Sequence, residues 1–112
     1  MKTLGEFEIL VLAALVRLDD EQAYGVAILR EIESRSGRAV SLGSLYPTLA
    51  RLEKKGYVHS RMGEATPVRG GRAKRYYVLT GVGAQALEES LRVLSAMASG
   101  LPGWQAGEGS TP

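Results

Sequence analysis

The sequence predicts a small, mainly helical domain with one β-hairpin and a final helix. In four segments apolar residues recur every three or four positions, which is typical of helices that pack on a core. Between the third and fourth segments, two short runs rich in aromatic and β-branched residues flank a stretch of Gly and Pro, a pattern typical of a hairpin. The 112 residues suffice for one core, and the absence of cysteine excludes disulfides and thiolate metal sites.

The first two helices follow from their apolar patterns. We expect one helix over residues 4–18, where apolar side chains crowd together and charged ones stand at the edges. We expect the next over residues 24–36, where Ile28 and Ile32 lie four positions apart and Gly37 follows as a residue that commonly ends a helix.

The third helix contains a proline, and the proline decides where the helix is expected to begin. In a helix interior Pro47 would lose a backbone hydrogen bond and clash with the preceding turn, at a cost of roughly 3 kcal/mol. We therefore predict a helix that begins with Ser44 as its N-cap and ends near Gly56, so that Pro47 falls in the first turn.

This third helix has two distinct flanks. Leu45, Leu49 and Leu52 share one flank and are expected to pack on the core. The other flank holds polar and basic residues spaced by four, three and four: Ser44, Thr48, Arg51 and Lys55. The helix is therefore expected to be buried along one side and to present polar groups along the other.

Two strands and a last helix complete the expected domain. The strands cover residues 57–62 and 74–79 and are joined by a long loop that contains Gly and Pro. Thr80 is the expected N-cap of a helix that runs to about Ser99. Residues 100–112 contain little to bury, so we expect them to form a disordered tail.

Charge is distributed unevenly along the chain. Residues 34–80 hold ten basic and two acidic side chains, a net charge of +8, whereas residues 1–33 and 81–112 carry net charges of −4 and −2. A basic block between acidic ends is expected of a surface that faces a polyanion. The alternative is a solvated basic face without a partner.

Three helices followed by a hairpin with a basic loop predict a winged helix-turn-helix, in which the helix before the hairpin enters the DNA major groove. The polar flank from Ser44 to Lys55 would then face the bases, and Arg51 can address guanine O6 and N7 bidentately. The hairpin loop would contact phosphate through glycines and cations: Arg69, Gly70, Gly71, Arg72 and Lys74. Double-stranded DNA is therefore the expected partner.

The last helix carries an apolar seam that indicates a homodimer. Its members are spaced by three and four: Ala84, Leu87, Leu91, Leu94, Ala98 and Leu101. The alternative is that the stripe packs only within its own subunit. Because the earlier elements already form a compact unit, a leftover apolar stripe favours a partner chain. The predicted interface residues are Leu87, Leu91, Leu94 and Ala98. Residues 1–79 would form the DNA-binding domain, residues 80–99 the dimerisation helix and residues 100–112 the tail.

The same residues bear on other functions. No catalytic group can be assembled, and His59, the only histidine, has no second ligand near it in sequence, so neither an enzyme nor a bound metal or cofactor is expected. The longest apolar run, residues 9–16, is too short to cross a membrane, and a cytoplasmic protein is expected. A winged helix that binds proteins is the alternative function, and one that binds RNA is a third; salt-dependent binding to duplex DNA would separate the regulator from the protein-binding module.

The stretches "GSLYPTLARLEKKGYV", "GGRAKRYYVLT" and "AYGVAILREIE" resemble the PadR family of bacterial transcriptional regulators over about residues 4–98. The resemblance implies a homodimeric repressor, with a single C-terminal helix that packs across the twofold axis against the partner's first helix. It also implies that Tyr46 touches the DNA backbone or braces the recognition helix. Trp104 either covers an effector pocket at the dimer centre or belongs to the disordered tail. Two departures from the family pattern are Ala73, where proline is common, and "TGVG" at residues 80–83, where acidic residues commonly open the last helix.

Overall fold

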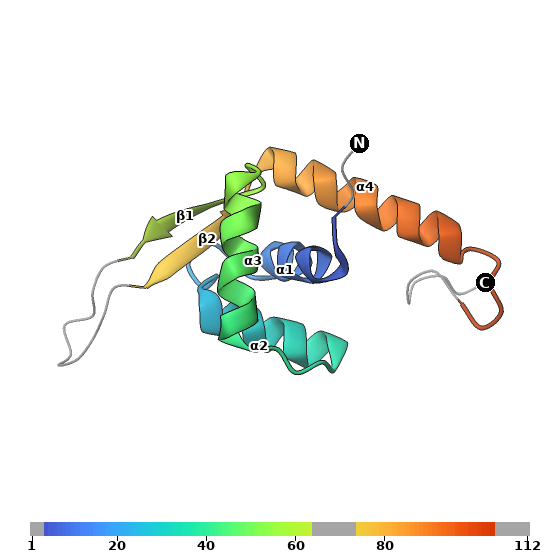
Figure 1. Cartoon of the computed structure of the whole chain (residues 1–112), viewed down its shortest axis with the longest axis horizontal. Helices are drawn as coiled ribbons and strands as arrows, with labels where there is room; N and C mark the ends of the chain where they lie inside the picture. The colour runs from blue at the N-terminus through green and yellow to red at the C-terminus, as the bar shows by residue number, and fades with distance from the viewer. Residues whose placement is uncertain (1–3, 64–73, 105–112) are drawn as a thin grey trace.

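The computed structural model describes residues 4–63 and 74–104, and it confirms the expected fold class (Figure 1). Within these residues, four helices and one antiparallel pair of strands follow in chain order: α1 (Glu6–Arg17), α2 (Gly25–Ser36), α3 (Leu42–Lys54), β1 (Val58–Met62), β2 (Arg75–Leu79) and α4 (Gly81–Ala98). Helices α1, α2 and α3 form a bundle, the hairpin extends from one side of it, and α4 packs on α1.

The apolar core joins α3 to α1 and α2. Leu45, Leu49 and Leu52 are fully buried, as the sequence predicts, and they pack among the buried apolar residues of the other two helices. Burial of one such side chain contributes about 1.5 to 3 kcal/mol. This leucine face therefore determines how α3 is rotated about its own axis.

Helix α3 begins earlier than the sequence suggests, so the predicted start at Ser44 is wrong. Ser41 is the N-cap, and its hydroxyl accepts a hydrogen bond of 3.1 Å from the Ser44 N–H. Pro47 is then the sixth helical residue and lies inside the helix. The proline cannot donate to the carbonyl of Gly43, four residues earlier, but Gly43 is exposed and water can donate there instead. An interior proline is tolerated because it lies on the outward side.

Helix α2 begins and ends close to the predicted residues. Tyr24 is its N-cap in extended conformation, and Gly37 follows the last turn at a φ of 72°. This left-handed backbone conformation costs glycine little and other residues more, which is why glycine is common after helices.

The hairpin is tied to the bundle along β2. Strands β1 and β2 pair as predicted, with Val58 opposite Leu79 at the end that joins α3 and α4. The backbone N–H of Tyr77 donates to the carbonyl of Ala23, just before α2, over 2.9 Å. A main-chain hydrogen bond thus holds the middle of β2 beside the segment between α1 and α2.

The N-terminus of α4 is a close packing site. Thr80 is the N-cap, as predicted, and its hydroxyl accepts a hydrogen bond of 2.9 Å from the Gly83 N–H. Gly83 is buried against the backbone carbonyl of Tyr57, where a Cβ would overlap the carbonyl oxygen. Glycine, a poor helix former, is needed here because the chain from α3 to β1 passes so close.

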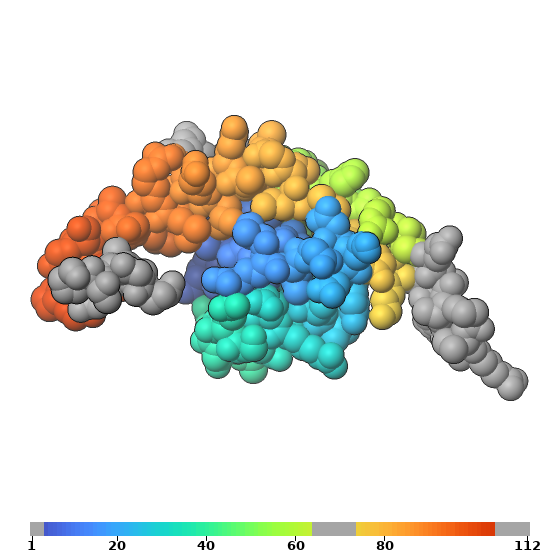
Figure 2. Space-filling view, turned by 180° about the vertical axis from the view of Figure 1, so that it is seen from behind, coloured from blue at the N-terminus to red at the C-terminus, as the bar shows by residue number. Residues whose placement is uncertain are grey.

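Helix α4 is covered over its first half only. Leu87 and Ser90 are buried, whereas residues 91–97 are all exposed. Figures 1 and 2 show the end of α4 extending past α1. Nearer the bundle, Leu91 lines a hollow together with Val16 of α1, and Leu94 lines another together with Ile9 of α1.

The chain makes a turn after α4. The Leu101 N–H donates to the Ala98 carbonyl, and the Trp104 N–H donates to the Leu101 carbonyl over 3.1 Å. Residues 100–104 of the predicted tail thus form a turn next to the end of α4. The rest of the predicted tail, residues 105–112, lies outside the described residues.

We predict that Gly83→Ala lowers the free energy of unfolding by roughly 2 to 3 kcal/mol, because the new methyl group meets backbone and forces a shift of α4. The matched control is Gly81→Ala, two residues earlier, where a Cβ would meet open space. That control should be neutral or stabilising by as much as about 1 kcal/mol. Urea denaturation followed by circular dichroism measures both, and equal effects would contradict the packing argument.

Candidate nucleic-acid interface

The exposed side of α3 is shifted by one position along the sequence from the flank that the sequence suggests. Thr48 is only 2% exposed and belongs to the buried side with the leucines, so its predicted place on the free flank is wrong. With Thr48 in the core, the centre of the outward face moves by one position. The residues opposite the core are exposed and are spaced by four, three and four: Gly43, Pro47, Ala50 and Lys54.

This outward face of α3 is smooth. Gly43, Pro47 and Ala50 have small side chains, which let a helix backbone approach base edges in the major groove. In Figure 1 α3 lies in front of α1, with its near side uncovered. The sequence pattern did not point to these residues, because only the leucines of this helix were assigned to the core. Thr48, which lies between two of those leucines, was the sign in the sequence that the buried face is wider.

Arg51 and Ser44 border the outward face and are exposed. The Arg51 Nη2 donates to the Thr48 Oγ1 over 3.0 Å, and the Thr48 hydroxyl donates to the Ser44 carbonyl over 3.0 Å. An arginine has five N–H donors in a planar fork. The guanidinium is therefore held on one side, while its remaining donors make no hydrogen bond with the residues that the structure describes.

Lys55 forms an ion pair with a residue of α1. The sequence places it on the DNA-facing flank, but it is the C-cap of α3, and its Nζ lies 2.9 Å from the Glu8 Oε2. The other Glu8 oxygen accepts a hydrogen bond of 2.9 Å from the Gly5 N–H. Lys55 is therefore not the free cation that the sequence suggests.

The Glu8 carboxyl is held in its charged form. Burial by itself would raise the pKa of Glu8, but the hydrogen bonds from Lys55 and Gly5, together with the charges of Lys55 and Arg51, bring that pKa below its ordinary value. Glu8 thus anchors the C-terminal end of α3 to α1 through a carboxylate.

Tyr46 braces α3 against α2. Its ring and hydroxyl lie directly over Gly25, the first residue of α2, where any side chain would overlap them. About half of Tyr46 remains exposed beside the outward face of α3. The geometry is that of a brace, one of the two roles that the resemblance implies, and it explains why α2 begins with glycine.

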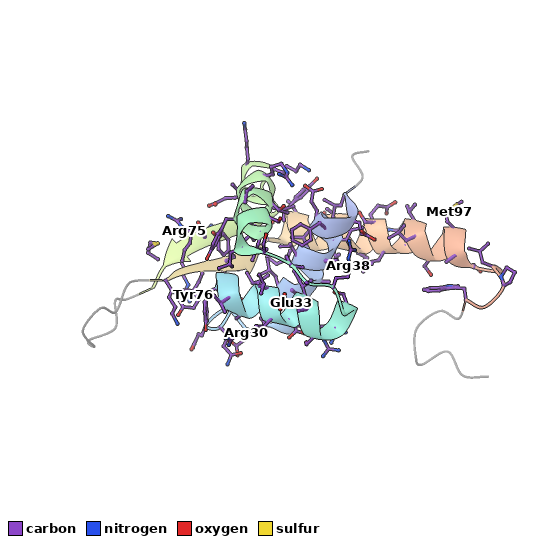
Figure 3. The ribbon with its side chains drawn as sticks, turned by 60° about the horizontal axis from the view of Figure 1, so that its bottom comes forward. Arg30, Glu33, Arg38, Arg75, Tyr76 and Met97 are labelled. Carbon is purple, nitrogen blue, oxygen red and sulfur yellow. The ribbon has the colours of Figure 1, made fainter. Side chains whose placement is uncertain are left out.

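A cluster of aromatic and cationic side chains lies at the end of the paired strands that leads into the hairpin loop. Tyr24 meets Tyr76 edge to face, with ring centres 5.8 Å apart. The Lys74 Nζ lies 4.1 Å from the centre of the Tyr24 ring, and the Arg61 guanidinium lies 4.8 Å from that of Tyr76. Figure 3 shows Tyr76 where β2 meets the start of α2. The remaining predicted loop contacts lie outside the described residues: Arg69, Gly70, Gly71 and Arg72.

The seam predicted on α4 has a buried part and a free part. Leu87 belongs to the chain's own core, so it is not the free interface residue that the sequence suggests. Leu91 and Leu94 are 46% and 54% exposed, and Ala98 is half-buried. Figure 3 shows Met97, also exposed, near the far end of α4 and away from the bundle.

The described residues hold neither a metal site nor a membrane-spanning helix. Among residues 4–63 and 74–104, no group of acidic, histidine or cysteine side chains could hold a metal ion. In the same ranges no helix has the length and apolar character needed to span a bilayer. His59 is exposed on β1, opposite Val78.

A bundle of three helices with an uncovered third helix, and a hairpin attached beside it, defines a winged helix-turn-helix domain. Residues 12–89 match the Transcriptional regulator PadR-like family. The chain belongs to this family of transcriptional regulators, which bind DNA and are not enzymes.

Individual relatives agree with this assignment. The chain is 41% identical over 86 residues to Transcriptional regulator Rv3488 of Mycobacterium tuberculosis, a match that covers 77% of this chain and 76% of the relative. A PadR family transcription regulator from Clostridium difficile is 28% identical, with a TM-score of 0.67 over 84% of this chain and 95% of that one. A transcriptional regulator from Clostridium thermocellum is 26% identical, with a TM-score of 0.68 over 81% and 84% of the two chains.

We predict that Glu8→Gln lowers the free energy of unfolding at neutral pH by roughly 1 kcal/mol, because the hydrogen bond from Lys55 loses its charged acceptor. The pKa of Glu8 is lowered on folding, so the stabilisation is complete above the pKa of an unfolded glutamate and is lost as the pH falls through the folded pKa. The difference between wild type and Glu8→Gln should therefore shrink in acid, as measured by urea denaturation at a series of pH values.

The control for this prediction is Glu88→Gln on the exposed side of α4, which should change stability little at any pH. A difference between wild type and Glu8→Gln that stayed constant down to strongly acidic pH would show that the carboxylate charge does not stabilise the anchor.

Proposed function

We propose that this regulator is a sequence-specific repressor that binds duplex DNA as a homodimer and responds to a small-molecule effector. The observation that carries the proposal is the uncovered face of α3, which offers a smooth helix surface bordered by the exposed side chain of Arg51. A helix with that surface fits the major groove. The protein would act in the cytoplasm, on the DNA that it regulates.

Base recognition and phosphate contact are assigned to different residues. Arg51 reads guanine, and Ser44, Tyr46 and Lys54 contact base edges or backbone along the same face, since all four are exposed. The hairpin neutralises phosphate through glycines and cations: Arg69, Gly70, Gly71, Arg72 and Lys74. Thr48 is not among the proposed DNA contacts because it is buried, and Lys55 is not among them because it is paired with Glu8.

The homodimer is supported by the uncovered half of α4. Leu91, Leu94 and Met97 on α4, and Leu101 in the turn after it, are all about half exposed or more, where the chain leaves its own bundle. Val16 on α1 is also exposed. Contiguous exposed apolar residues mark an interaction surface, and a second copy offers the same surface in return.

The repressor role and the effector come from the family resemblance. Trp104 supports the effector, because its side chain is 48% exposed at the end of the uncovered apolar stretch. An indole at such a position can cover a flat apolar molecule held between two subunits.

The test is selection of binding sites from a randomised duplex library, followed by affinity measurements across a range of salt concentrations. We expect a pseudo-palindromic site with half-sites about 34 Å apart or a small multiple of that, and a logarithm of affinity that falls linearly with the logarithm of salt. If no duplex binds even at low salt, DNA binding is refuted and the protein-interaction module takes its place.

We predict that Arg51→Ala weakens binding to the selected site by roughly 1 to 3 kcal/mol and relaxes one symmetric base position, because a bidentate contact to guanine is lost. The control is Arg92→Ala, an exposed arginine on α4 that removes the same charge far from α3. Fluorescence anisotropy with the selected duplex and a scrambled one measures both variants. Equal losses on the two duplexes would make Arg51 a phosphate contact and leave base reading to other residues of the face.

We also predict that Leu91→Glu produces monomers that remain folded, because Leu91 is half exposed in its own subunit and the charge would be buried only in the dimer. Val82→Glu is the control, since Val82 is also exposed on α4 but lies off the seam. Sedimentation equilibrium reports the mass and circular dichroism the fold. A dimeric Leu91→Glu variant would remove this stripe from the interface.

A further inference from the structure

Thr48 is a polar residue on the side of α3 that packs against the apolar core. It is only 2% exposed and lies among Leu45, Leu49 and Leu52, which are fully buried. A valine of the same shape would fill the space and bring no polar atom into the core. The hydroxyl group of Thr48 therefore calls for an explanation beyond packing.

The hydroxyl makes two hydrogen bonds in opposite directions. As a donor it bonds to the Ser44 carbonyl one turn earlier, over 3.0 Å, which is common for threonine in helices. As an acceptor it receives the Arg51 Nη2 over 3.0 Å, and this second bond joins a buried atom to an exposed guanidinium. Donation to the carbonyl directs an oxygen lone pair towards the arginine.

Thr48 is the one hydrogen-bond partner of the Arg51 side chain among the described residues. The nearby Glu8 carboxylate is already engaged by Lys55 and by the Gly5 N–H. A free arginine side chain samples many rotamers, and ordering it at the moment of binding lowers affinity. A guanidinium tied at one corner is ordered before DNA arrives.

We propose that Thr48 is a positioning residue for base recognition, which holds the Arg51 guanidinium in the orientation that reads a base while making no contact with DNA itself. The inference rests on the proposed function, in which Arg51 is the base-reading residue. It assigns to a buried threonine an influence on sequence preference that its location alone would not suggest.

The test is a double-mutant cycle in the full chain. Thr48→Val removes the hydroxyl at constant shape, Thr48→Ser keeps the hydroxyl, and each is also made together with Arg51→Ala. The measured quantity is the ratio of affinities for the duplex selected by the wild-type protein and for a scrambled duplex of equal length. A general loss of folding or charge lowers both affinities and leaves this ratio unchanged.

Thr48→Val should lower the ratio by roughly 3- to 10-fold, the size of one hydrogen bond that preorganises a contact. Thr48→Ser should keep the wild-type ratio. In the Arg51→Ala background Thr48→Val should have no further effect, because the arginine that it positions is absent. A wild-type ratio in Thr48→Val, or an equal drop without the arginine, would overturn the proposal.

An NMR measurement on the unbound wild-type protein gives an independent result. The Arg51 side-chain nitrogen resonances should show restricted motion compared with those of Arg30, an exposed arginine on α2 that makes no side-chain hydrogen bond or ion pair with the described residues. Thr48→Val, or Thr48→Ala where the valine variant does not fold, should release the Arg51 side chain. A freely moving Arg51 in the wild type would overturn the proposal. Failure of the proposed function has a different signature, namely a wild-type protein that selects no duplex.

Discussion

Burial of the leucine face of α3 against α1 and α2 is the constraint on which the other features depend. Leu45, Leu49 and Leu52 are fully buried, so α3 cannot turn about its axis without exposing apolar surface worth several kcal/mol. That orientation sends Pro47 and Ala50 outward, where their size suits close approach to another molecule. It also explains the interior proline, because the carbonyl left without its usual donor faces solvent.

Polar contacts then adjust a helix that the core has already placed. At its start α3 is capped by Ser41 and braced by Tyr46 against α2; at its end Lys55 is anchored by Glu8. Each contact is worth about 1 kcal/mol, far less than the leucine face. These contacts fix the orientation of α3, since they hold both ends of the helix. A further polar contact, from Thr48, holds the exposed side chain of Arg51.

Helix α4 is packed on the core along its first half and exposed along its second half. Its first half shares the core with α1, and its 18 residues make a rod about 27 Å long whose second half is uncovered. In the proposed homodimer this rod would transmit the position of one bundle to the other, so that the spacing of the two α3 helices would follow from a rigid element. Gly83 matters to that arrangement because it sets how closely α4 begins against the chain leaving α3.

The local elements of this protein were determined by its sequence. Periodicity located all four helices, the glycine after α2 and the threonine before α4 marked helix boundaries, and the aromatic runs located both strands, since these signals act within a few residues. Tertiary structure decided which side of each helix is free. Whether Thr48 lies in the core, whether Lys55 has a partner on α1, and whether Leu87 is already covered depend on residues distant in the chain, and Glu8 and Lys55 are 47 positions apart. A pattern in one helix shows that its faces differ, but contact energy with the rest of the molecule determines their rotation, and here that rotation moved the candidate interface by one residue.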